Sequence, residues 1–217
     1  DAQVPPKISL HPQKSDFFNT MPCLLPPEYD RFGVKVVSRI AGNKPSLRSD
    51  VLLYQASTGI LLSLMSADWI TQMRTGAVAA LTINTLQSSC ANVYAFVGLG
   101  STAIATMQCL LSTLPLQKQI TCKLLRYKRQ ADDFINLFSA FSNVRFVIVE
   151  NNEDLIKDSD VVVSAVTEMP TLFCEKNDLY KKGVLLVPIH TRGFQNCDLF
   201  FDHVFADIGD EQSIEQS

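Results

Sequence analysis

The sequence lacks several features that mark whole classes of protein. No apolar run approaches the roughly 18 residues that a membrane-spanning helix needs, so no membrane partner is expected. The six cysteines include no C-x-x-C pair, which argues against a metal site and is typical of reduced thiols in a cytoplasmic protein. A net charge of -3 offers no excess of cations to a nucleic acid. What is left is an ordinary globular composition, 47% hydrophobic and 19% charged.

Glycine is also scarce, at nine residues, yet two glycines stand in an informative place. An apolar run from Val93 to Val97 is followed by Gly98-Leu99-Gly100, then Ser101-Thr102-Ala103 and a helical pattern. A strand, a glycine turn and a helix in this order are typical of a dinucleotide site. The helix N-terminus would bind the pyrophosphate, and Ala103 would let the helix pack close to its strand. The alternative is a tight turn with no ligand.

Strands and helices alternate after this turn, which predicts βαβ units in a doubly wound parallel Rossmann sheet. We assign residues 89–217 to this NAD(P)-binding domain and residues 1–88 to a smaller, mostly β domain with a connecting helix. The fold class is therefore α/β. The expected strands of the larger domain are 93–97, 119–125, 144–149, 160–166, 183–189 and 203–207. Those of the smaller domain are 7–11, 17–25, 33–39 and a hairpin of 50–55 with 59–65.

Two cations lie in the smaller domain among apolar or small residues. Lys35 shares one face of an apolar strand with Val37, and Arg74 lies near the start of a helix rich in alanine, threonine and glycine. Lys35 could be a lysine at a sheet edge with its ammonium in solvent. Arg74 could be a surface arginine, or it could clamp a carboxylate or phosphate with its bidentate fork.

The end of the second Rossmann strand indicates which dinucleotide is preferred. NAD-specific domains place an acid there for the ribose 2′-hydroxyl. This sequence has Arg126, Lys128 and Arg129, with no acid before Asp132. We therefore expect a 2′-phosphate, hence NADP(H), with NAD(H) possible as a second cofactor. Lys128 and Arg129 are the better candidates, and the alternative is a solvated run of charge.

Taken together, these segments resemble the ornithine cyclodeaminase/mu-crystallin family over nearly the whole chain. The resemblance is carried by Met21-Pro22, the Lys35 strand, Thr58-Gly59, the Thr71 to Ala77 helix and the glycine turn. It implies that Arg74 holds the substrate carboxylate and that Lys35 lies beside the reacting centre. It also implies cofactor contacts from Thr75, Gly98, Gly100, Ser101, Thr102, Ala103 and Val166, and a second carboxylate-binding role for Lys7.

The sequence departs from the family pattern after its fifth Rossmann strand. Cyclodeaminases have an aspartate there that acts on the distal amine of the substrate, and alignment places Arg192 at or near that position. Because an arginine is no general base at neutral pH, ornithine cyclisation is disfavoured. His190 and Arg192 are candidate catalytic residues that could bind an acidic or differently shaped substrate. His190 could act as an acid or base, and the alternative is a structural histidine at a strand end. Family members also extend further at both ends, so we expect this sequence to be shortened.

The resemblance implies an NAD(P)-dependent oxidoreductase that acts on the C–N bond of a small amino or imino acid, working as a homodimer. The range of reactions includes a ketimine reductase, an amino acid dehydrogenase and a cyclodeaminase-like lyase. The alternative is a non-catalytic protein of the crystallin type that binds a dinucleotide or small ligand.

Overall fold

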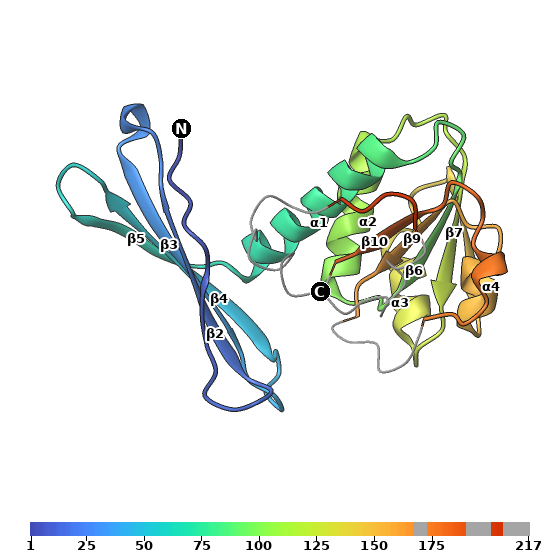
Figure 1. Cartoon of the computed structure of the whole chain (residues 1–217), viewed down its shortest axis with the longest axis horizontal. Helices are drawn as coiled ribbons and strands as arrows, with labels where there is room; N and C mark the ends of the chain where they lie inside the picture. The colour runs from blue at the N-terminus through green and yellow to red at the C-terminus, as the bar shows by residue number, and fades with distance from the viewer. Residues whose placement is uncertain (167–172, 190–200, 206–217) are drawn as a thin grey trace. The chain divides into compact units, whose positions relative to one another are not determined.

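The computed structural model describes residues 1–166, 173–189 and 201–205, which belong to two compact units (Figure 1). One unit contains Asp1–Thr71, and the other lies within Gln72–Val204. The division falls inside helix α1 (Asp68–Leu86), whereas the sequence placed it at residue 88, after the helix. A parallel sheet with helices, accompanied by an antiparallel sheet, confirms the expected α/β class.

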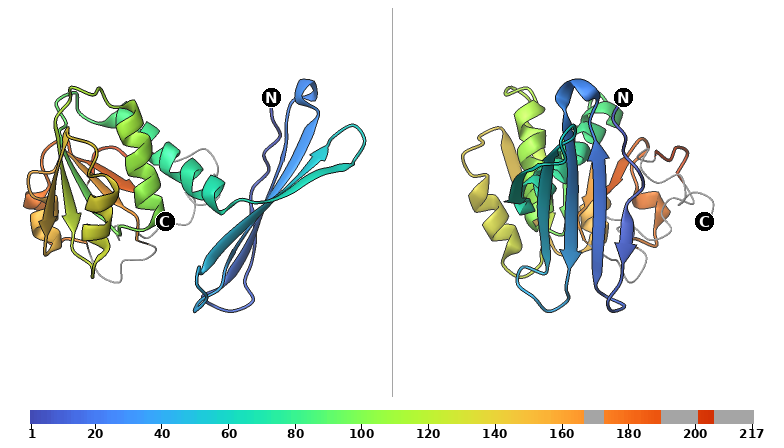
Figure 2. Two further views of the ribbon diagram at one scale, coloured as in Figure 1. Left: turned by 180° about the vertical axis from the view of Figure 1, so that it is seen from behind. Right: turned by 90° about the vertical axis from the view of Figure 1, so that its left-hand side faces the viewer.

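The first unit is one antiparallel sheet of five strands in the order β1-β2-β3-β4-β5, seen as a single layer in Figure 2. Its strands are β1 (Ile8–Leu10), β2 (Phe17–Leu24), β3 (Arg31–Arg39), β4 (Leu47–Gln55) and β5 (Leu61–Ser66). Each strand follows its neighbour in sequence, so tight connections suffice throughout. A short 3-10 helix, η1 (Pro27–Tyr29), interrupts the turn between β2 and β3.

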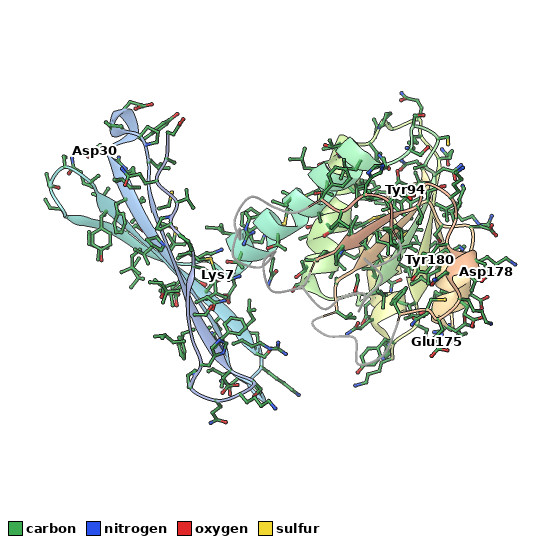
Figure 3. The ribbon with its side chains drawn as sticks, in the orientation of Figure 1. Lys7, Asp30, Tyr94, Glu175, Asp178 and Tyr180 are labelled. Carbon is green, nitrogen blue, oxygen red and sulfur yellow. The ribbon has the colours of Figure 1, made fainter. Side chains whose placement is uncertain are left out.

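Asp30 joins two connections at one end of this sheet (Figure 3). Its backbone is left-handed, with φ of 48°, and its carboxylate accepts hydrogen bonds from the side chains of Gln55 and Ser57 and from the Ser57 N–H. The hydrogen bond from Gln55, then those from Ser57, lower the pKa of Asp30. The β4–β5 turn also needs Gly59 at φ of 72°, as the sequence suggested for a hairpin.

The second unit is a parallel sheet in the order β10-β9-β6-β7-β8. This is the doubly wound arrangement in which the chain starts at the centre, moves to one edge and returns to build the other. The strands are β6 (Val93–Val97), β7 (Ile120–Leu125), β8 (Val144–Val149), β9 (Val161–Ser164) and β10 (Leu185–Pro188). The expected strand at 203–207 is wrong for its described part, because His203–Phe205 form no strand.

Helices cover both faces of the parallel sheet, and each face has its own apolar cluster (Figure 1). On one face, Phe96 and Leu124 pack with residues of α1, α2 (Ser101–Thr113) and α3 (Gln130–Leu137). On the other, Ala95 and Val162 pack with α4 (Asn152–Ile156) and Phe173. A 3-10 turn, η2 (Asn177–Leu179), lies between Phe173 and β10.

The small residues of α1 have a structural use. A Cβ at Gly76 would lie 2.5 Å from the Ala105 carbonyl carbon and 2.6 Å from the Thr106 nitrogen of α2. The two helices therefore touch backbone to backbone, and only glycine fits at their crossing. This contact explains why α1 is rich in small residues.

Candidate functional site

The glycine turn lies at the carboxyl end of β6, where the sheet changes direction. From β6 the chain passes to β7 through α2 on one face, while β9 on the other side follows α4 on the opposite face. Such a switch point opens a crevice outside the strand ends, where open α/β sheets bind ligands. The predicted glycine turn thus stands in the place that dinucleotide binding requires.

Gly98 and Gly100 are glycines for different reasons. Gly98 has φ of 76°, and a Cβ there would lie 2.7 Å from Val166 Cγ1 and 2.9 Å from the Ala165 carbonyl carbon. Gly98 is therefore required by the protein itself, and it brings Val166 next to the turn. Apart from its chain neighbours, no atom of the described residues would lie within 4 Å of a Cβ at Gly100. The fold leaves this space open, as the approach of a phosphate to the backbone would demand.

Helix α2 begins directly after Gly100, which is its N-cap and gives no side-chain hydrogen bond. Ser101 is exposed, Thr102 is half-buried and Ala103 is fully buried against the sheet. The N–H groups of the first turn have no intrahelical partners in any helix, and the helix dipole is positive here. The arrangement can bind an anion, with Ser101 and Thr102 at its rim and Ala103 packed below.

The three cations that follow β7, Arg126, Lys128 and Arg129, have different partners in the structure. Arg126 Nε lies 2.7 Å from Glu150 Oε1, at the end of the neighbouring strand β8, and hydrogen bonding to this carboxylate raises the pKa of Arg126. Lys128 has φ of 52°, and its ammonium lies 5.1 Å from the ring centroid of Tyr127. Arg129 is the exposed N-cap residue of α3. All three cations are exposed, and Arg126 alone of the three has an ion-pair partner, Glu150, among the described residues, a partner that the local sequence could not reveal.

Lys35 is on the central strand β3 and not at a sheet edge, which overturns the edge-lysine alternative. It is half-buried and pairs with Met21 on β2 and with Val51 on β4. Lys7 directly precedes β1, whose Ile8 pairs with Thr20 on β2. It lies beside the middle of the sheet in Figure 3.

The sheet face that carries Lys35 also carries the start of α1. Two positions along from Lys35, Val37 pairs with Ser49, whose N–H donates to Asp68 Oδ1 at 2.5 Å. The Ser49 hydroxyl also lies 2.9 Å from the Thr71 hydroxyl. Val37 and Ser49 are both buried, so the first turn of α1 is fixed on the Lys35 face.

Arg74 and Thr75 follow on α1, one turn after Thr71. In a helix, residues three and four positions apart lie on one face, so Thr71, Arg74 and Thr75 form a continuous stripe. Arg74 is exposed and makes no ion pair with a residue in the described ranges, while Thr75 is half-buried. The guanidinium is thus available to an anionic ligand.

The amino end of the parallel sheet holds a buried polar cluster that belongs to the fold. Asp160 accepts hydrogen bonds from the N–H groups of Asn92 and Val93, and from Lys181 Nζ at 2.5 Å. Burial alone would raise the pKa of Asp160, but these hydrogen bonds outweigh it and lower that pKa. Burial raises the pKa of nearby Tyr94 to about 12. The glycine turn lies at the opposite ends of these strands. The cluster therefore stabilises the sheet and takes no part in the candidate site.

The remaining candidates yield less. His190 and Arg192 lie outside the described residues. In the described part of the chain, no group of histidine, cysteine, aspartate and glutamate side chains could hold a metal ion, and no helix could cross a membrane. A cavity of about 350 Å³ at the end of the antiparallel sheet is lined by Leu24, Phe32, Tyr54, Gln55, Ala56 and Gly59. Its lining has no acid or cation, so it adds no candidate chemistry.

Known proteins resemble this chain in sequence and in fold. The nodulation efficiency protein NfeD of Rhizobium meliloti is 28% identical over 196 residues, which are 88% of this chain and 59% of that protein. The structure of Thermococcus litoralis Delta(1)-pyrroline-2-carboxylate reductase with NADH and L-proline is similar at a TM-score of 0.75 and 23% identity, over 86% of this chain and 58% of that one. An archaeal alanine dehydrogenase dimer with bound NAD is similar at 0.71 and 22%, over 85% and 56%.

The chain therefore spans less than two thirds of the length of each of these proteins. The family model for the ornithine cyclodeaminase/mu-crystallin family matches residues 1–203, and this match confirms the resemblance that the sequence motifs indicated. The chain belongs to the ornithine cyclodeaminase/mu-crystallin family.

Proposed function

We propose that this protein is an NAD(P)-dependent oxidoreductase that acts on the C–N bond of a small amino or imino acid. The observation that carries the proposal is the glycine turn at the switch point, with open space above Gly100 and a free helix N-terminus. The related reductase and dehydrogenase structures, which contain NADH or NAD, support a nicotinamide dinucleotide as the ligand of this turn.

Arg74 and Lys35 are the proposed catalytic residues. Arg74 would bind the α-carboxylate with its fork and orient Cα for hydride transfer. Lys35, half-buried on the central strand, would hydrogen-bond the substrate and move a proton at its nitrogen. Lys7, directly before β1, would give a second cation for the carboxylate. The bound dinucleotide supplies or accepts the hydride, and amine oxidation to imine releases one proton.

NADP(H) is the proposed preference. Lys128 and Arg129 are exposed at the end of β7, the place where NAD-specific domains have an acid. Thr75, Ser101 and Thr102 would contact the phosphates, and Val166 would border the nicotinamide side. His190 and Arg192 remain proposed substrate contacts, and an arginine at position 192 argues against ornithine cyclisation.

A homodimer is the proposed assembly, formed through the antiparallel sheet. The sheet face opposite Lys35 carries exposed apolar side chains, including Leu10 and Leu64 (both 66% exposed) and Phe18 (41%). Such a continuous apolar face is typical of a protein interface. The dimeric state of the related alanine dehydrogenase structure supports a second copy as its occupant.

The test records nicotinamide absorbance at 340 nm during incubation with amino acids, or with keto acids plus ammonia. Turnover is expected with at least one small substrate. Arg74→Ala should raise the KM for that substrate strongly and leave NADPH affinity nearly unchanged. Tight NADPH binding without turnover on any candidate would identify a non-catalytic binding protein and refute the enzyme.

A further inference from the structure

We propose that Gly76 is a positioning residue for the reaction, because its missing side chain sets the distance between two helices of the candidate site. One is α1, which carries Arg74, and the other is α2, which follows the glycine turn. This inference rests on the proposed function, because it takes Arg74 as the carboxylate clamp and the glycine turn as the dinucleotide site. It gives a functional role to a residue that is buried between the two helices.

Helices α1 and α2 lie side by side and run in the same direction (Figure 1, Figure 2). Gly76 of α1 meets Ala105 of α2 at the crossing. Further along both helices, Asn84 Nδ2 donates a hydrogen bond to Thr113 Oγ1 at 2.7 Å. Each helix advances by eight residues between these two contacts, which is about 12 Å. The two helices therefore form a parallel pair that is joined at two levels.

Arg74 is close to this crossing. It lies two residues before Gly76, and the residue two positions before Ala105 is Ala103, in the first turn of α2. In a parallel pair of helices, such residues stand at the same level along the two axes. Arg74 is thus level with the helix N-terminus that is proposed to bind the phosphates. The spacing of the two helices then fixes how far the carboxylate clamp stands from the dinucleotide.

The crossing at Gly76 leaves no room for a larger residue. A Cβ there would lie 2.5 Å from the Ala105 carbonyl carbon, whereas carbon atoms in favourable contact are about 3.5–4.0 Å apart. The opposing atoms belong to the backbone of a helix, so no side chain can rotate out of the way. An added methyl group therefore pushes the two helices apart by about 1 Å. Arg74 moves with its helix.

A shift of this size affects hydride transfer more than binding. The glycine turn is unchanged, and a long arginine side chain still reaches a carboxylate from a helix that has moved slightly. Hydride transfer is more demanding, because the reacting atoms must approach within about 3–3.5 Å, and a misplacement of about 1 Å can cost about 100-fold in rate. Gly76 therefore acts on kcat, and the two binding steps are largely independent of it.

Gly76→Ala and Asn84→Ala test this inference, because both disturb the same helix pair but only the first does so beside Arg74. Absorbance at 340 nm gives kcat for the substrate that the native protein turns over fastest. Dividing kcat by the number of NADPH-binding sites, counted by fluorescence titration, removes the effect of any unfolded protein. In Gly76→Ala, kcat per site should fall at least about tenfold, while the substrate KM and the NADPH Kd change less than about threefold. Asn84→Ala should keep kcat per site within about twofold.

Three results would overturn the inference while the proposed function stands. They are an unchanged kcat per site in Gly76→Ala, an equal loss in Asn84→Ala, and a crystal structure of Gly76→Ala in which the two helices have kept their spacing. If Gly76→Ala does not fold, Ala105→Ser adds one oxygen atom at the same crossing, and its kcat per site should fall at least about threefold. An unchanged value in that variant would overturn the inference as well. If the native protein turns over no amino or imino acid, the proposed function fails, and this inference fails with it.

Discussion

Gly100→Ala separates a glycine kept for a ligand from a glycine kept for the fold. Its backbone, at φ of -81° and ψ of -170°, suits alanine, and apart from its chain neighbours the added Cβ meets no atom of the described residues within 4 Å. Alanine is a poorer N-cap than glycine by roughly 0.5–1 kcal/mol, whereas restricting the unfolded chain gains about 0.4–1 kcal/mol. The free energy of unfolding should therefore change by no more than about 0.5 kcal/mol.

Dinucleotide binding should respond very differently. The methyl group would stand where a phosphate approaches the first N–H groups of α2, and it would remove one hydrogen bond to a charged group, worth about 1.5–3 kcal/mol. This corresponds to a Kd about 10- to 150-fold higher. NADPH fluorescence titration measures the Kd, and thermal unfolding of the unliganded protein measures the stability.

Gly98→Ala is the matched contrast. Its positive φ and the 2.7 Å approach to Val166 Cγ1 should destabilise the fold itself by more than 1 kcal/mol. An unchanged NADPH Kd in Gly100→Ala would refute the phosphate-binding role of the turn. A loss of stability in Gly100→Ala as large as that in Gly98→Ala would contradict the open space assigned to it.

Three further variants test other parts of the molecule. Arg129→Ala should raise the NADPH Kd about tenfold and leave the NADH Kd nearly unchanged. Arg126→Ala removes only the partner of Glu150, so it should change the ratio of the NADPH Kd to the NADH Kd little. If both variants have the same ratio of the two Kd values, the cations form only a solvated run of charge. Asp160→Asn should lower the melting temperature at pH 7, where the ionised carboxylate of the native protein is stabilising. Because the native pKa of Asp160 is lowered, this stabilisation is present above the ordinary carboxyl pKa and is lost as pH falls through the lowered pKa. The difference in melting temperature between the native protein and Asp160→Asn should therefore decrease towards pH 3. A difference that does not change with pH would contradict the role of the ionised carboxylate. Leu64→Glu should convert the proposed dimer to a monomer in sedimentation velocity, because Leu64 lies on the exposed apolar face. Ser63→Glu, on the Lys35 face, should leave the dimer intact. A dimer that persists in Leu64→Glu would place the interface elsewhere.

Local patterns in the sequence predicted most of the fold. The alternation of Lys35 with Val37 placed both on one strand face, and the apolar run before Gly98 indicated a buried strand in front of a turn. These signals are local, because strand period and turn chemistry depend on neighbouring residues. The expected strand at 203–207 failed because a short alternating run has no means of showing whether a partner strand exists beside it.

Contacts between distant residues could not be predicted in this way. Lys35 proved central because four other strands assemble around it. The partner of Arg126 lies 24 residues away, on the neighbouring strand. The sequence shows that residue 76 is glycine, but only the crossing of α1 and α2 explains why no larger residue fits there.

The single-layer sheet has a thermodynamic consequence. Both clusters of buried apolar residues in the described structure lie in the second unit, so the first unit has no comparable core of its own. A sheet with one apolar face in water is marginal alone and becomes stable when that face is covered by another chain. If the proposed homodimer forms, the folding of this sheet is linked by mass action to the concentration of the protein. Dilution of such a dimer should then melt the unit that holds Lys35 before the unit that holds Gly100.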